Sequence, residues 1–191
     1  MINLLKKKLK LIFKFSLPYI LLIFLSSFNN ISAAELDSLF FKLKNAENKS
    51  SAILYENKIW NYWLKDGSNE KNNTRMQLGI SLLQSGELDD AMQIFQSLSK
   101  EEPFWAEPIN KIATIKFLKG DYFGSVNDIQ LTLKLEPRHF GAISGLVQIN
   151  MFLKNYNQAL MNLDYVTDIH PFINIKNLRP VILKLIKKSS I

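Results

Sequence analysis

Apolar residues recur along this chain at helical spacing, and the same arrangement returns every 34 residues. Pro103, Pro137 and Pro171 stand at that interval, and so do Gly86 and Gly120. Between them, apolar residues follow the i, i+3, i+4 pattern of amphipathic helices. Glycine favours the left-handed turn that ends a helix, and proline disfavours helix in the residue before it. The pattern therefore predicts an all-α fold of repeated antiparallel helix pairs.

Small residues mark the points where the paired helices are expected to cross. Ala91, Ser125 and Ala159 share the 34-residue interval, and a large apolar residue follows each of them by four positions. Only small side chains allow two helix backbones to approach closely, so we expect these three residues to be buried. At the third turn Lys154 replaces glycine, and we expect the neighbouring Asn155 to adopt the left-handed conformation.

The first unit places Leu78-Gly79, Leu82, Ala91-x-x-x-Phe95 and Pro103 at the offsets of a tetratricopeptide repeat (TPR), with Arg75 in place of the usual tryptophan. Residues 72–171 therefore resemble the TPR family, whose period is 34 residues. The resemblance implies an αα-hairpin solenoid of three repeats, at 72–105, 106–139 and 140–171. A different αα repeat is the alternative.

The segments on either side of the repeats also read as helical. Residues 35–71 predict a degenerate helical pair that caps the array, and residues 172–191 predict a capping helix, beginning near Pro180, with a basic tail. The strings ELDxLFxxL, IWxxW and EPRHFGA make the chain similar to a group of small exported bacterial TPR proteins of uncharacterised activity.

Residues 1–34 have the pattern of a secretory signal peptide. Five lysines precede an uncharged run at 15–28, and small residues lead to Ala34. A helix over that run rises about 21 Å, short of the roughly 30 Å hydrocarbon core. We therefore expect cleavage after Ala34 or Ala33 and a periplasmic protein. The alternative is an uncleaved helix that anchors the chain in the inner membrane, the one case in which membrane contact is expected.

Charge and chemistry exclude several classes of function. Five of the basic residues behind the net charge of +7 lie in the signal segment and five in the C-terminal tail, so the repeat region is mildly acidic and nucleic-acid binding is not expected. The chain has no cysteine. His139 and His170 stand at turns between repeats, without neighbouring carboxylate clusters. The sequence therefore predicts no catalytic residue, metal or cofactor, and no enzyme.

The TPR resemblance implies that ligands bind the concave side, on the first helix of each pair. Glu107 is the single charge expected there, and Met76 and Ser144 stand where the clamp for chaperone carboxylate tails has basic residues. The function expected is a scaffold in the cell envelope that binds a polypeptide segment, and the alternative is a membrane-anchored assembly or biogenesis factor. The predicted peptide-binding residues are Asn73, Met76, Ile80, Asn110, Thr114, Phe117, Ser144, Gln148 and Met151.

Overall fold

The computed structural model describes residues 33–189. The chain divides into two compact units, residues 1–39 and 40–191. Of the first unit only residues 33–39 are described, and they are helical. The predicted signal peptide therefore lies almost entirely outside the described residues. Within the described range, no helix combines the length and the apolar character that a bilayer crossing requires.

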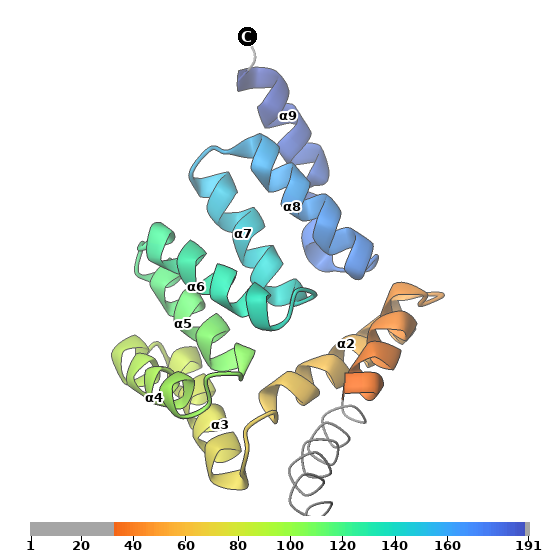
Figure 1. Cartoon of the computed structure of the whole chain (residues 1–191). Coiled ribbons are helices and arrows are strands. Elements are labelled where there is room, and N and C mark those ends of the chain that lie inside the picture. Colours follow the sequence, from red (N-terminus) through yellow and green to blue (C-terminus); the bar gives the residue numbers. More distant parts are fainter. Residues whose placement is uncertain (1–32, 190–191) are drawn as a thin grey trace, which may run out of the picture. The chain divides into compact units, whose positions relative to one another are not determined.

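Helices make up the second unit, which begins with the last turns of a helix that ends at residue 44. Three antiparallel helix pairs follow one another along the chain and form the predicted αα-hairpin solenoid (Figure 1). The elements are α2 (Lys49–Leu64), α3 (Glu70–Ser85), α4 (Leu88–Glu101), α5 (Ala106–Leu118), α6 (Tyr122–Leu135), α7 (Phe140–Phe152), α8 (Tyr156–Ile169), η1 (Asn174–Leu178) and α9 (Arg179–Ser189). The prediction of an all-α repeat fold is confirmed.

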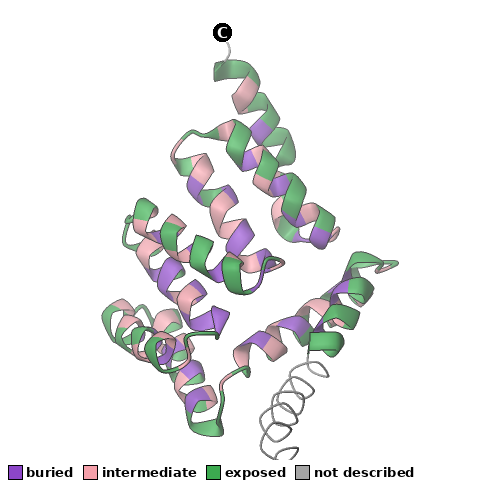
Figure 2. Cartoon of the chain, viewed as in Figure 1, coloured by how far each residue is buried: buried purple, intermediate pink, exposed green. Residues whose placement is uncertain are grey.

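Small residues lie at the helix crossings, as the pattern predicted. Ala91, Ser125 and Ala159 are buried, and Figure 2 shows buried positions along the packed faces of the helices. The space is tight, because a Cβ atom added to Gly79 would lie 2.7 Å from the ring of Phe95. Ser125 is compatible with burial because its hydroxyl donates a hydrogen bond to the backbone carbonyl of Ala113 at 2.8 Å.

The turns inside the helix pairs use the left-handed conformation. Gly86 and Gly120 have φ values of 85° and 79°, as expected for glycine after a helix. In the third pair the left-handed residue is Lys154, with φ 60°, whereas Asn155 has φ −83°. The expectation for Asn155 was wrong, because the turn keeps the strict 34-residue register and Lys154 occupies the glycine position.

Residues 40–64, the part of the N-terminal helical pair in the second unit, reach beyond the first repeat and contact the third. The ring of Trp63 stacks on that of His139, with centroids 4.0 Å apart. The Lys44 ammonium lies 2.9 Å from the carboxylate of Asp168 on α8. Because α2 also packs against α3 and α5, residues 40–64 of the second unit bridge the array from its first repeat to its last and do more than cap its start.

The C-terminal helix α9 packs on α8 and closes the array, as predicted. Ile182 is fully buried in this contact, and Arg179 forms an ion pair with Asp164 on α8. Between α8 and α9 the chain makes the short 3-10 helix η1, which the sequence pattern did not indicate. Its position matters because η1 forms one wall of a hollow described below.

Candidate functional site

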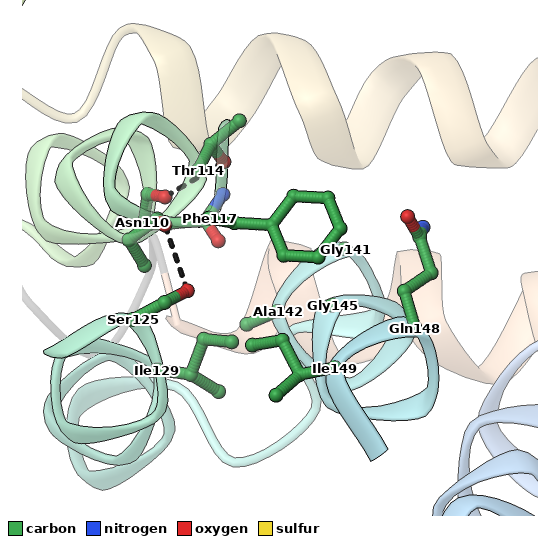
Figure 3. Close-up of a pocket in the computed structure, with 11 residues that line it drawn as sticks. Asn110, Thr114, Phe117, Ser125, Ile129, Gly141, Ala142, Gly145, Gln148 and Ile149 are labelled. Carbon is green, nitrogen blue, oxygen red and sulfur yellow. Dashed lines mark hydrogen bonds between the residues drawn. The ribbon is translucent and has the colours of Figure 1, made fainter. Parts of the chain in front are cut away.

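A pocket of about 130 Å³ opens between α5 and α7, and we call it the inner pocket. Its floor is apolar: Ile129 and Ile149 point toward one another beneath Ala142 (Figure 3). Its rim carries polar groups and one aromatic ring. The lining residues are Asn110, Ala113, Thr114, Phe117, Ser125, Ile129, Gly141, Ala142, Gly145, Gln148 and Ile149, none of them ionisable.

Hydroxyl and amide groups at this rim offer hydrogen bonds to a ligand. The Thr114 hydroxyl donates to the backbone carbonyl of Asn110 at 3.0 Å, so its oxygen can still accept a bond. The Gln148 side chain is exposed and forms no hydrogen bond within the described part of the chain. An amide can both donate and accept, which matches the alternating N–H and C=O groups of a peptide backbone.

A second, more open hollow of about 490 Å³ lies beside the first and shares Gly141 and Gln148 with it. We call it the α2 hollow because α2 forms one of its walls. The other walls come from the start of α7 and from η1. Its lining residues are Glu56, Trp60, Phe140, Gly141, Ser144, Gln148, Ile173, Asn174, Ile175, Asn177 and Leu178.

Trp60 holds α2 against α7. Its ring would lie 2.6 Å from a Cβ atom added to Gly141, so glycine is needed there for the close approach. The ring also packs edge-on against Phe140, with centroids 5.3 Å apart. The chain therefore supplies one wall of its own concave surface.

Glu107 is fully buried, which corrects the expectation that it is a charged group on the groove surface. One carboxylate oxygen lies 2.7 Å from the Lys111 ammonium. The other accepts hydrogen bonds from the Asn110 amide at 3.1 Å and from His139 Nε2 at 2.7 Å. A buried carboxylate is tolerated because Lys111 balances its charge, while Asn110 and His139 donate hydrogen bonds to it.

His139 is likewise a core residue with defined bonds, and it does more than occupy a turn. It is the N-cap of α7, where its Nδ1 accepts a hydrogen bond from the Ala142 N–H at 3.1 Å. Because Nδ1 accepts, the ring proton lies on Nε2 and is donated to Glu107. Burial alone raises the pKa of Glu107, but Lys111 and His139 outweigh it, and the net pKa lies below the ordinary value. The cluster of Glu107, Lys111, Asn110 and His139 therefore fixes the start of α7, whose Gly141 lines both hollows.

The structure brings several predicted peptide-binding residues together. Asn110, Thr114, Phe117 and Gln148 line the inner pocket, and Ser144 joins Gln148 in the α2 hollow. Asn110 is buried and its amide is engaged by Glu107, so it contributes to the shape of the rim more than to contact with a ligand.

The residues predicted from the first repeat lie elsewhere. Met76 is fully buried in the core with Phe95, so its assignment as a ligand contact is wrong. Ile80 packs against the same core. The Asn73 side chain accepts a hydrogen bond from the Gly67 N–H at 3.1 Å and so closes the turn before α3. Met151 is half-buried on α7 and lines neither hollow.

Sequence reasoning missed the residues that α2 and η1 bring to the site, chiefly Glu56, Trp60 and Asn174. The IWxxW string was the one available signal, because two tryptophans three residues apart share a helix face. Nothing periodic shows that this face packs on the third repeat. Among the described residues, no group of three or more His, Asp and Glu side chains could hold a metal ion.

Comparisons with known proteins agree with this fold. No family model matches the chain. A TPR repeat-containing protein from Rhizobium etli is 32% identical over 136 residues. The match covers 71% of this chain and 66% of that relative, so slightly less than two thirds of the relative is represented.

Two solved TPR domains share the fold at low sequence identity. The Sgt2 TPR domain from Aspergillus fumigatus superposes with a TM-score of 0.59 at 13% identity, over 64% of this chain and 83% of that domain. The first TPR of Spaghetti (RPAP3), bound to the HSP90 peptide SRMEEVD, gives 0.57 at 15% identity, over 64% and 95%. With the 34-residue period, the three helix pairs and the relative from Rhizobium etli, these matches show that the chain belongs to the tetratricopeptide repeat family.

Proposed function

We propose that this chain is a non-enzymatic scaffold that binds a segment of another polypeptide on the concave side of its repeats. The inner pocket carries the proposal. It combines an apolar floor with hydrogen-bonding groups at its rim, and its lining includes Thr114, Phe117 and Gln148, three of the residues predicted to bind the peptide. This is the arrangement that recognises a peptide, with an apolar anchor for affinity and backbone hydrogen bonds for orientation.

Charge makes an acidic chain terminus an unsuitable ligand. The inner pocket has no basic side chain, and the Lys111 ammonium nearby is paired with Glu107. Strong binding of carboxylates requires cationic groups or arginine forks. The peptide SRMEEVD in the similar structure of Spaghetti ends in an acidic stretch. We therefore expect a neutral or basic segment with apolar anchors, bound at micromolar affinity after ordering costs.

We further propose that the protein acts in the cell envelope, after cleavage of residues 1–34. The lysine-rich start, the short uncharged run and the small residues before Ala34 support this location. The alternative is an assembly or biogenesis factor anchored by an uncleaved N-terminal helix. In both alternatives the polypeptide binds in the same groove. They differ in whether the mature protein keeps residues 1–34.

Site-specific photo-crosslinking tests the proposed binding surface. A photoreactive amino acid in place of Gln148 should capture a discrete polypeptide from living cells. The same substitution at Gln130, exposed on α6, is the matched control. Adducts at position 148 and none at 130 are the expected result. Equal adducts at both positions, or adducts only at position 130, would overturn the proposal.

A further inference from the structure

We propose that the α2 hollow receives a basic side chain, lysine or arginine, of the polypeptide that the groove binds. This inference rests on the proposed function and names the chemistry of one subsite. Elements outside the three repeats build most of the hollow, because α2 and η1 form its walls beside the repeat helix α7. Charge complementarity with Glu56 identifies its occupant as a cation.

Glu56 is the one ionisable side chain in the lining of this hollow. The remaining lining consists of aromatic and aliphatic groups with the Ser144 hydroxyl and the amides of Gln148, Asn174 and Asn177. The carboxylate is about one-third exposed, so it is accessible and only partly screened by water. A single anion beside Trp60 and Phe140 favours a cation with an apolar stem, because aromatic faces also attract cations.

The nearest partner of Glu56 does not neutralise it. His170 Nε2 lies 3.2 Å from the Glu56 carboxylate, and its Nδ1 has no hydrogen-bond partner in the described structure. Burial lowers the pKa of His170, and this outweighs the opposing effect of Glu56. The imidazole is therefore neutral at neutral pH, and it donates a hydrogen bond without supplying a positive charge.

Two lysines lie near the hollow without lining it. The Lys111 ammonium lies 5.3 Å from the centroid of the Trp60 ring, and its charge is matched by Glu107. The Lys176 ammonium donates to the backbone carbonyl of Pro171 at 2.7 Å, which leaves its charge unmatched. Lys176 also lowers the pKa of His170, so its field reaches this region. Lys176 therefore weakens the attraction of a cation to Glu56 but does not occupy the site.

A pair of blocked amino acids tests the subsite directly. N-acetyl-arginine methylamide carries the cation, and N-acetyl-citrulline methylamide has nearly the same shape without it. Both are titrated into the full chain while the three tryptophan indole N–H signals are followed by NMR. We expect the arginine probe to shift the Trp60 signal at millimolar concentration and to bind about five times more tightly than citrulline, the size of one partly exposed ion pair.

Three variants separate charge from structure. Glu56→Gln removes the charge, yet the new amide oxygen can still accept the hydrogen bond from His170, so arginine should bind no better than citrulline. Lys176→Gln should strengthen arginine binding, because it removes a repelling charge. Glu70→Gln, which removes an exposed carboxylate on α3, should change nothing. Equal binding of both probes to the native chain, or preserved arginine preference in Glu56→Gln, would overturn the inference.

The outcome is independent of the photo-crosslinking result. If position 148 captures a polypeptide but the two probes bind alike, the proposed function stands and the basic-residue subsite is wrong. If the probes discriminate but no polypeptide is captured, the subsite stands as a cation site and the scaffold function fails.

Discussion

Among residues 33–189, Lys154 is the one residue other than glycine with a positive φ. It has φ 60° at the turn where the first two repeats have glycine. A side chain with a Cβ atom pays a steric cost in this region, of about 1 kcal/mol relative to glycine. The packing of α7 against α8 fixes this turn, and it offsets the cost of a backbone conformation that lysine disfavours.

Lys154→Gly should therefore raise the free energy of unfolding by about 0.5–1 kcal/mol. Chemical denaturation with circular dichroism measures this change. Lys119 is the matched control, because it also ends a first helix but has φ −83°. Lys119→Gly should lower stability, since glycine there adds freedom to the unfolded chain and the variant also loses the ion pair with Asp89. A loss of stability in both variants would contradict the assignment of strain to Lys154.

His139 is the second residue whose role depends on contacts distant in the sequence. It caps α7, stacks on Trp63 and donates to the buried Glu107. His139→Ala removes all three contacts and leaves a buried carboxylate short of one donor, so we expect a loss of roughly 2–4 kcal/mol. His139→Asn can keep the cap, because its side-chain oxygen can accept from Ala142, and should lose less.

Thermal unfolding of the two variants provides the measurement. An alanine variant as stable as the native chain would show that the Glu107 cluster is not a structural element. If both variants remain folded but the start of α7 moves, the Gln148 side-chain signals in NMR spectra should shift.

At the scale of elements, Arg75 shows how a departure from the repeat pattern is accommodated. It stands where the repeat usually has tryptophan, and it joins α3 to α4 through a two-point contact with Glu101, at 2.6 and 2.9 Å. Ser97 donates to the same carboxylate at 2.8 Å. The hydrogen bond from Arg75 is the main reason that the pKa of Glu101 falls from 4.5 to about 2. A polar clamp thus replaces an apolar contact.

This clamp predicts the direction of a pH effect. A lowered pKa in the folded state stabilises the fold above the ordinary pKa of the group, and the contribution is lost as the pH falls from about 4.5 toward 2. Glu101→Gln should therefore lower stability more at pH 6 than at pH 2.5, measured by urea unfolding at both pH values. Glu47→Gln, at an exposed turn, is the control. An equal effect of Glu101→Gln at both pH values would show that the clamp does not stabilise the fold.

At the scale of the whole molecule, the 34-residue period was sufficient to predict the three helix pairs, their two glycine turns and their buried crossing residues. These features depend on local spacing, as Ala91 and Gly86 illustrate. The bridge formed by α2 could not be predicted. Trp63 and His139 are 76 positions apart, and Glu107 and His139 lie 32 positions apart at opposite ends of the second repeat, so the 34-residue period connects neither pair. The same long-range packing explains why Glu107 is buried and why Glu56 lines a hollow.

Residues 1–34 are predicted to be removed from the mature chain. Because the uncharged run is short and ends in small residues, intact-mass measurement on exported protein should find Ala34 or Glu35 at the N-terminus. Full-length protein in the membrane fraction would support the anchored assembly factor and contradict cleavage. The matched sample is the same chain expressed with a deletion of residues 1–34, whose mass should equal that of the form cleaved after Ala34 plus one initiator methionine.

Binding of a polypeptide segment on the concave side is tested most directly by the dissociation constant of the segment captured at position 148. Calorimetry should compare three proteins at 50 and 500 mM salt. They are the native chain, a groove variant that combines Thr114→Ala with Gln148→Ala, and an outer pair that combines Gln130→Ala on α6 with Gln158→Ala on α8. We expect the groove variant to bind at least about tenfold more weakly, as the loss of two hydrogen bonds implies, and the outer pair to bind normally. Salt should change affinity only a few-fold, because one ion pair at most is screened. Binding that collapses in high salt but is unaffected by the groove variant would contradict the account and place the contact on another surface.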